Sequence, residues 1–474
     1  MKAIKYLLAG ALLTAFSAPT MAQDVKSQIE AITKVVVDNK DNLKAVKDQL
    51  KDFEKANKKN PEALAGLGRA YLDIKDTVNA EKYANLAIEK GKNSAYGYIL
   101  MGDIAVIKND GGAAATWYRQ ATTMAPNNPE GYIKYANIYR KRSPHQAVEM
   151  LEKLRTVLPD YPVDAEAGHF FYLAHQNDKA FEYYSKLTDL SKIDPERVKE
   201  FATAAYVLGK NDKSLEVSLA GLQANPRNAV FNRLAFYNSL VLKKYKDAIS
   251  YADKLFTASD SAKFIHSDYT YAGHAYLADS LYDKAIEYFQ KAIDSNLEPS
   301  ENPATMKLIS SAYRGKGDWN NAVLWFDKYL KNEPKPSAID YADLAGIYRN
   351  QAEKATGAAQ IEALKKADAV YSDLLAKHPE EAEYANYMKA IVNSQMDPDS
   401  KHGLAKPYFE KLVELISQHP QKNETDNARL VTSYHYLGAY YLIVKNEKSK
   451  ADEYFRKVLE IDPNNATAKQ ALGL

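Results

Sequence analysis

The sequence of 474 residues contains no cysteine. The chain therefore forms no disulfide, builds no cysteine-ligated zinc site and offers no thiol for the attachment of a lipid anchor. Its stability must come from packing, and 46% of its residues are hydrophobic, which is enough for a core. Tryptophan is scarce, with three residues, whereas 35 tyrosines supply most of the aromatic surface.

A hydrophobic run long enough to span a bilayer is also missing. The longest apolar stretch, Tyr6 to Phe16, is shorter than the ~20 residues that a spanning helix needs. Lys2 and Lys5 precede this stretch and the small residues of Ser17 to Ala22 follow it. A positively charged N-terminal region, a short apolar run and a following segment of small residues that suits cleavage are typical of a secretory signal peptide. We therefore predict a signal peptide over residues 1–22.

Neither sign of charge is in excess outside this segment. The chain has 63 Lys and Arg against 61 Asp and Glu, and the two lysines of the signal segment bring the basic count down to 61. A neutral chain lacks the basic surface that binding to nucleic acid requires. The export signal and the lack of an anchoring cysteine predict a location in the bacterial periplasm. The mature protein is expected to be either soluble there or peripherally attached to an outer-membrane complex.

An internal repeat of about 34 residues runs through the rest of the chain. Each copy carries a small residue, usually followed by a large residue four positions later and an apolar residue seven positions later. This spacing forms one stripe of a helix, and the small residue marks a close approach of two helices. The small residues are Ala80, Ala114, Ala147, Ala180, Ser214, Ala248, Ala285, Ala322, Ala367, Ala405 and Ala451.

Another helical pattern precedes most of these small residues. Large, apolar, small and large residues occupy positions i, i+3, i+4 and i+7, which again lie on one buried face. Two clear copies read Leu64-Leu67-Gly68-Tyr71 and Tyr434-Leu437-Gly438-Tyr441. Each repeat is thus predicted to be a hairpin of two helices, and proline ends several of the second helices, as at Pro126.

These patterns resemble the tetratricopeptide-repeat (TPR) family, whose repeat reads W-x2-L-G-x2-Y, then A-x3-F, then P over 34 residues. The resemblance covers residues 61–474 in eleven units and implies an all-α superhelix, the TPR solenoid. It is weak in 162–227, where Gly168 and the run from His169 to Ala174 fit the pattern badly.

The resemblance also suggests a division of the chain. Residues 23–60 are expected to form a degenerate N-terminal hairpin that caps the array. Residues 61–227 form the N-terminal TPR array, including the weak region, and residues 228–474 form the C-terminal array.

Motifs for catalysis or metal binding are missing from the sequence. The nine histidines include no H-E-x-x-H motif, and the six-residue spacing of His169 and His175 places them on different faces of a helix. A toroid of helical hairpins with two catalytic carboxylates is disfavoured by the short, regular repeat. We therefore expect no enzyme activity, no catalytic residue, no cofactor and no bound metal.

In TPR proteins the first helix of each unit lines a concave groove, and its exposed positions contact the ligand. The resemblance therefore implies a non-catalytic scaffold that binds protein partners. The residues that it places in the groove are Arg69, Lys134, Asn137, Arg140, Asn232, Arg233, Tyr271, His274, Lys307, Arg314 and Arg349. Among them Arg140, Arg314 and Arg349 occupy the same place in three units. Because arginine makes bidentate contacts with carboxylates, an acidic or C-terminal peptide segment is the expected ligand.

A second function stays open at this point. A groove rich in tyrosine would also suit a carbohydrate- or peptidoglycan-associated accessory of an outer-membrane assembly. Discrete protein partners that copurify from the envelope would favour the scaffold, whereas retention on glycan would favour the accessory.

We predict that the mature protein begins at Gln23, because the signal pattern ends at Ala22. N-terminal sequencing of the protein released by osmotic shock measures this directly. A chain that retains Met1, or one that stays in the membrane pellet at high salt, would contradict the prediction.

Overall fold

The computed structural model describes residues 21–474, so all but the last two residues of the predicted signal segment lie outside the described residues. Within the described part, the chain consists of helices joined by turns, and β-structure is limited to one isolated bridge between Asn228 and Asp260. The all-α fold predicted from the repeat is confirmed. None of the helices in residues 21–474 combines the length and the apolar character needed to cross a membrane.

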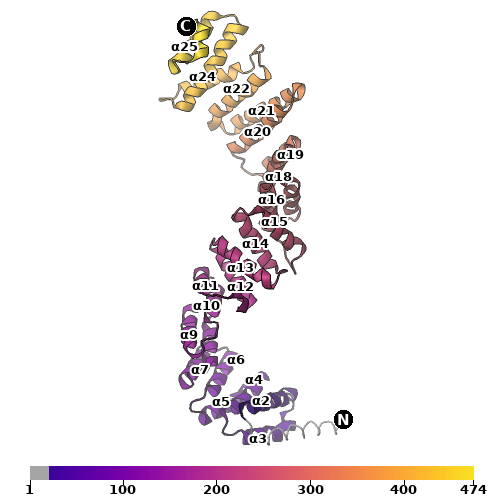
Figure 1. Ribbon diagram of the computed structural model, residues 1–474, viewed down its shortest axis with the longest axis vertical. Coiled ribbons are helices and arrows are strands. Elements are labelled where there is room, and N and C mark those ends of the chain that lie inside the picture. Colours follow the sequence, from indigo (N-terminus) through magenta and orange to yellow (C-terminus); the bar gives the residue numbers. More distant parts are fainter. Residues whose placement is uncertain (1–20) are drawn as a thin grey trace. The chain divides into compact units, whose positions relative to one another are not determined.

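Eleven helical hairpins follow one another in residues 61–461 (Figure 1). Their first helices are α4 (Pro61–Asp73), α6 (Tyr96–Ile107), α8 (Pro129–Tyr139), α10 (Val163–Leu173), α12 (Pro195–Val207), α14 (Ala229–Val241), α16 (His266–Ala278), α18 (Asn302–Lys316), α20 (Ala338–Lys354), α22 (Ala382–Met396) and α24 (Glu424–Ala439). Their second helices are α5 (Thr77–Lys90), α7 (Gly111–Met124), α9 (Pro144–Val157), α11 (Asn177–Tyr184), α13 (Asn211–Ala224), α15 (Tyr245–Thr257), α17 (Tyr282–Asp294), α19 (Trp319–Asn332), α21 (Gly357–Lys377), α23 (Lys406–Ser417) and α25 (Lys448–Ile461). The helices α2 (Met21–Asp38) and α3 (Lys47–Ala56) precede this array, and α26 (Ala466–Leu472) follows it.

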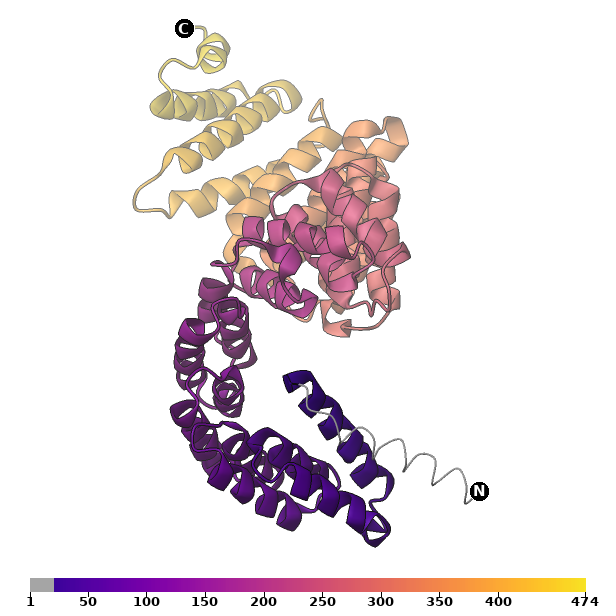
Figure 2. The same ribbon diagram turned by 60° about the horizontal axis from the view of Figure 1, so that its bottom comes forward.

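The helices divide into two compact units. One comprises the described residues up to Leu242 together with Thr257–Asp260, and the other comprises Lys243–Phe256 and Ser261–Leu474. Within the N-terminal unit each second helix packs between two first helices, and first helices also touch one another, as α4 touches α6 and α10 touches α12. Figure 2 shows the helices of this unit, drawn in indigo to purple, packed one against the next along the chain. Within the C-terminal unit the same alternation links α16 through α25. Side chains on consecutive first helices therefore become neighbours.

Most hairpins close on a contact between a small residue of the first helix and a large residue of the second helix, although Phe236 takes the small position in α14, and Ser218 and Ala252 take the large position in α13 and α15. A Cβ atom added to Gly102 would lie 2.3 Å from the ring of Tyr118, and one added to Gly273 would lie 2.4 Å from the ring of Phe289. Both rings are buried. Because a side chain would occupy the space of the ring, the small residue allows the ring to rest on the backbone of the first helix.

Gly168, which the sequence suggested would fit the pattern badly, makes this contact as well. A Cβ atom at Gly168 would lie 2.7 Å from the ring of Tyr184, which is fully buried. The sequence signal is poor because Asp164 stands where most other units have a large residue, and it pairs with Arg155 at 2.9 Å. The second helix α11 is also short, and a loop with the 3-10 turn η2 (Leu190–Lys192) replaces its last turns.

Serine stands at a small position in two hairpins, on the first helix at Ser310 and on the second helix at Ser214. The Oγ of Ser310 donates a hydrogen bond to the carbonyl oxygen of Ala322 at 2.6 Å, and the Oγ of Ser214 donates to the carbonyl oxygen of Ala202 at 2.8 Å. Each bond joins the two helices of one hairpin, so each buried hydroxyl is paired. The helices must approach closely for a side chain as short as serine to reach the partner backbone.

We predict that Gly273→Ala destabilises the α16–α17 hairpin, because its Cβ atom would lie 2.4 Å from a fully buried Phe289 ring. Overpacking of this kind costs about 1–3 kcal/mol. The matched control is Gly346→Ala in α20, where the added Cβ atom meets no atom within 4 Å. Because alanine is the better helix former, this control should stabilise α20 by about 0.5–1 kcal/mol. Hydrogen exchange of peptides from each hairpin measures both effects, and equal protection in the two variants would contradict the contact.

Candidate partner-binding surface

The residues that the resemblance places in the groove lie on the first helices or at their ends, and we call the non-core side chains of these helices the first-helix surface. Arg69 is on α4, Lys134 and Asn137 are on α8, Arg140 caps the end of α8, and Asn232 and Arg233 are on α14. These six belong to the N-terminal unit. The C-terminal unit holds Tyr271 and His274 on α16, Lys307 and Arg314 on α18, and Arg349 on α20.

In the N-terminal unit, a largely covered carboxylate contacts two of the predicted cations. Asp103 on α6 lies 2.6 Å from Arg69 of the preceding first helix and 2.9 Å from Lys134 of the following one. The hydroxyl of Tyr118 donates to the same carboxylate at 2.7 Å. Burial and the Asp103 carboxylate raise the pKa of Tyr118, so the phenol stays a donor. Arg69 and Lys134 thus join three consecutive first helices.

A similar arrangement joins α10 to α12 through residues that the sequence did not single out as a site. Arg197 lies 3.1 Å from Glu166, and the Nδ1 of His169 lies 2.9 Å from Glu200. The hydroxyl of Tyr184 donates to Glu200 at 2.5 Å. Both contacts join residues 31 positions apart. Opposite charges about one repeat apart are therefore the sequence signal that could have found them.

The same kind of pair occurs in the C-terminal unit. Lys307 on α18 lies 2.7 Å from Asp340 and 3.5 Å from Asp343 at the start of α20. Burial by itself would raise the pKa of Asp340, but hydrogen bonds from Lys307, Ser337 and Tyr329 lower it to about 2. Lys307 is therefore neutralised within the protein and is a structural link between two hairpins.

Arg140, Arg314 and Arg349 differ from these cations. The guanidinium of Arg140 donates to the Oδ1 of Asn137 at 3.2 Å, a bond within its own helix turn. Among the described residues, no carboxylate forms an ion pair with any of these three arginines. Arg349 lies beside Tyr371, whose pKa burial raises to about 12 while the arginine partly offsets that rise. Three equivalent positions thus carry guanidinium groups whose charge the protein does not neutralise.

Asn232 is not part of this surface. Its side chain is fully buried, and its Nδ2 donates to the carbonyl oxygen of Pro226 and to the Oγ of Ser259, both at 3.0 Å. The reason is its place in the repeat. Asn232 precedes Ala248 by sixteen residues, as Leu64 precedes Ala80, and therefore occupies the first large position of the buried face.

The other predicted residues of α14 and α16 are half-buried. The ring of His274 meets the ring of Phe289 edge-on at 5.5 Å, and burial lowers the pKa of His274. A neutral imidazole packed on an aromatic ring adds no charge to the surface. Arg233 and Tyr271 are also partly covered and take part in contacts within the protein.

The last hairpin adds an apolar hollow that the sequence did not indicate. Its walls include His435, Ala439, Leu442 and Ile443, and it encloses about 480 Å³. A π-helical turn, η5 (Tyr440–Val444), extends α24 here and leaves Ile443 75% exposed. The one-residue change of helical register displaces these side chains from the regular pattern, so the repeat gave no signal for them.

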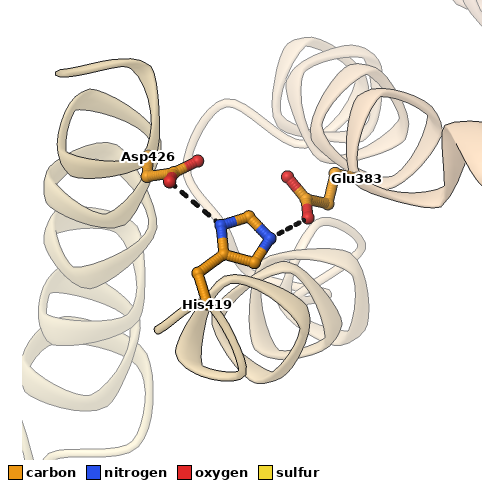
Figure 3. Close-up of side chains that lie close together, drawn as sticks. All are labelled: Glu383, His419 and Asp426. Carbon is orange, nitrogen blue, oxygen red and sulfur yellow. Dashed lines mark hydrogen bonds and ion pairs between the residues drawn. The ribbon is translucent and has the colours of Figure 1, made fainter. Parts of the chain in front are cut away.

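One group of side chains in the described residues is close enough to be considered for a metal ion: Glu383, His419 and Asp426 (Figure 3). The Nε2 of His419 lies 2.6 Å from Glu383, and its Nδ1 lies 2.9 Å from Asp426. Because the carboxylates lie off opposite ring nitrogens, a metal on one nitrogen would have only one of them as a further ligand. Arg429 adds positive charge 3.6 Å from Glu383. The geometry therefore suits a hydrogen-bonded imidazole better than a metal centre.

We predict that Lys307→Ala destabilises the contact between α18 and α20, because it leaves the buried Asp340 carboxylate without its cation. The expected loss is about 1–2 kcal/mol, once screening of the partly exposed lysine is allowed for. Because the pKa of Asp340 is lowered, the stability that its ionised carboxylate gives to the fold should depend on pH. This contribution is present above about pH 4 and disappears as the pH falls toward 2.

Hydrogen exchange of peptides from α18 and α20 at pH 7 and pH 3 measures the effect. The exposed Lys335 in the following loop offers a charge-matched control, Lys335→Ala, which should leave protection unchanged. Equal protection in the Lys307 and Lys335 variants at pH 7 would show that the ion pair contributes nothing.

Two of the solved structures similar to this chain are described as tetratricopeptide-repeat proteins. The C-terminal part of a TPR repeat-containing protein from Cytophaga hutchinsonii is 22% identical, with a TM-score of 0.44, over 58% of this chain and 99% of that one. A tetratricopeptide repeat protein from Parabacteroides merdae is 18% identical, with a TM-score of 0.32, over 52% of this chain and 98% of that one. PilF of Pseudomonas aeruginosa is 21% identical, with a TM-score of 0.32, over 42% of this chain and 93% of that one. No match to a curated protein sequence was found.

Family models described as tetratricopeptide repeat match two segments of the sequence. One covers residues 272–338, which hold most of α16 and the helices up to α19, and the other covers residues 432–465 in the last hairpin. Both segments show the small residue of the first helix against the aromatic ring of the second, as Gly273 faces Phe289 and Gly438 faces Phe455. The chain therefore contains tetratricopeptide repeats, which the family models match in these two segments.

Proposed function

We propose that this protein is a non-catalytic scaffold of the bacterial envelope that binds an acidic segment of a partner polypeptide on its first-helix surface. One observation carries the proposal. Arg140, Arg314 and Arg349 stand at equivalent positions of three hairpins and have no carboxylate partner in the described residues, whereas Arg69, Lys134 and Lys307 are neutralised by acids of neighbouring hairpins.

The chemistry of arginine favours a carboxylate-bearing ligand. A guanidinium group stays charged at every physiological pH and presents a planar fork of N–H donors that matches a carboxylate. Outside the signal segment the chain carries equal numbers of basic and acidic residues, so it has no excess charge to attract polyanions in general. The attraction is therefore confined to the few cations that remain unpaired, which favours a short acidic segment over a nucleic acid.

The expected binding mode follows from the repeat. TPR repeats form protein-interaction scaffolds, and Arg314 and Arg349 lie on successive first helices of one compact unit. A partner segment that bridges two such helices is held at more than one point, so weak single contacts add up. Arg140 belongs to the other unit and offers a separate contact point.

The envelope location is supported by the sequence pattern of residues 1–22, with its basic head, apolar run and small-residue exit. A partner would then be a protein that is exported to the same compartment or exposes a segment there. Association with an outer-membrane complex through such a segment needs no anchor on this chain.

We predict that replacing Arg140, Arg314 and Arg349 together by alanine abolishes capture of the partner and leaves the helical content unchanged. Each arginine that binds a carboxylate contributes about 1.5–3 kcal/mol, which corresponds to at least about tenfold in affinity. Capture by the unmodified protein should also weaken as salt rises, because salt screens the attraction between charges that are not fully buried. A pull-down from envelope extract, followed by titration of the isolated partner, measures both.

The charge-matched control replaces Arg119, Arg142 and Arg456, three exposed arginines that lie outside the first helices. This control should retain the partner. Unchanged capture by the first triple variant, or equal loss in both, would contradict the proposal. Retention of envelope glycan without any protein would contradict it as well and would favour the carbohydrate-associated function.

A further inference from the structure

The cluster around His419 joins two first helices of the C-terminal unit. Glu383 lies on the first turn of α22, Asp426 lies on the first turn of α24, and His419 lies in the segment between α23 and α24 (Figure 3). The imidazole is held between the two carboxylates at 2.6 Å and 2.9 Å. The side chain of Asp426 is nearly fully buried, and those of His419 and Glu383 are about one-third exposed.

Counting protons shows which form of the histidine this arrangement requires. An ionised carboxylate only accepts hydrogen bonds, so both ring nitrogens of His419 must donate. A neutral imidazole carries a single N–H, and its other nitrogen would then present a lone pair to a carboxylate oxygen. The imidazolium ion, which has two N–H groups, satisfies both carboxylates at once.

The charges around the imidazole come from both neighbouring helices. On α22 it faces Glu383, and on α24 it faces Asp426, with Arg429 lying 3.6 Å from Glu383. Asp426 also accepts the backbone N–H of Asn423 at 3.1 Å as part of the capping box of α24, which fixes its position. Two carboxylates against one arginine leave a net negative site when the imidazole is neutral.

We propose that His419 is a pH-dependent clamp that holds α22 to α24 when it is protonated and releases part of that hold when it loses its proton. Protonation and the contact between α22 and α24 are directly linked, because the proton that charges the ring of His419 also supplies its second hydrogen bond. The proposal is independent of any ligand of the first-helix surface. Its consequence is that the last hairpin of the array opens from α22 more readily at alkaline pH than at acidic pH.

The direction of the pH effect follows from the shifts of the two partners. Hydrogen bonding to Asp426 and Glu383 raises the pKa of His419, so its stabilisation is complete below about pH 6.5 and disappears as the pH rises through the raised value. Hydrogen bonding from His419 lowers the pKa of Asp426, so its contribution is complete above about pH 4 and disappears at lower pH. The clamp is therefore complete between about pH 4 and 6.5 and weakens above that range. Arg429 still pairs with Glu383 there, which makes the loss partial.

The test uses the full chain and two measurements. Titration of histidine ring protons by NMR gives the pKa of His419, with its signal assigned by its absence from His419→Gln. Hydrogen exchange of peptides from α22 and α24 between pH 5.5 and 8.5, corrected for the intrinsic pH dependence of exchange, gives the opening equilibrium. Each unit by which the pKa exceeds that of a free histidine should appear as up to a tenfold change in opening across the titration.

Two variants and one control separate the clamp from a purely structural role. Glu383→Gln removes one carboxylate without touching the cap of α24 and should lower the pKa of His419. In His419→Gln, the protection of α22 and α24 should no longer depend on pH. His402→Gln removes an exposed histidine of the same unit and should behave as the unmodified protein. A pKa of His419 at or below that of a free histidine, or the same pH dependence in His419→Gln and the unmodified protein, would overturn the proposal.

Discussion

The contact between a small residue of the first helix and a large residue of the second helix, which most hairpins make, is the constraint on which the array depends. A ring such as that of Tyr118 or Phe289 rests directly on the backbone of its partner helix because glycine leaves no side chain in the way. Close packing of this kind leaves little freedom in the distance and angle between the two helices. Where hairpins of one compact unit share this contact, each presents its first helix to the next hairpin in a similar way.

This regular placement explains why ion pairs form between residues about one repeat apart. Arg69 meets Asp103, Arg197 meets Glu166, and Lys307 meets Asp340, with separations of 34, 31 and 33 residues in the sequence. Each pair is partly shielded from water, so it contributes more than an exposed surface pair would. The pairing also neutralises these cations, so their charge is not available to a ligand. The cations left over on the first-helix surface are few, and their rarity gives Arg140, Arg314 and Arg349 their significance in an otherwise neutral array.

Departures from the repeat coincide with the unusual features of the protein. The polar cluster of Glu383, His419 and Asp426 lies around the segment between α23 and α24, where the chain passes from one hairpin to the next. The π-helical turn after α24 exposes Ile443 and opens an apolar hollow in the last hairpin. In both places the close packing of ring on backbone does not dictate the local structure, so side-chain chemistry other than simple core packing can appear.

The sequence by itself determined the fold class and the hairpin register, because the small and large positions are one stripe of a helix and a stripe has to be buried. It also determined which residues stand at equivalent positions, as for Arg314 and Arg349.

Only the tertiary structure decided which cations are free, because pairing depends on whether an acid of the next hairpin comes within reach. Lys307 has Asp340 at 2.7 Å, whereas no acid pairs with Arg314 in the described part of the chain. The burial of Asn232 could have been predicted from its separation of sixteen residues from Ala248 in the sequence. A polar residue at a position that is usually large and apolar obscures the pattern. The clamp at His419 was not singled out from the sequence: Glu383 and His419 are 36 residues apart, about one repeat, but no motif marks this histidine as a residue held between two carboxylates. The period of the repeat indicates which residues are candidates for such contacts, but only the positions of whole helices decide which of them come within reach.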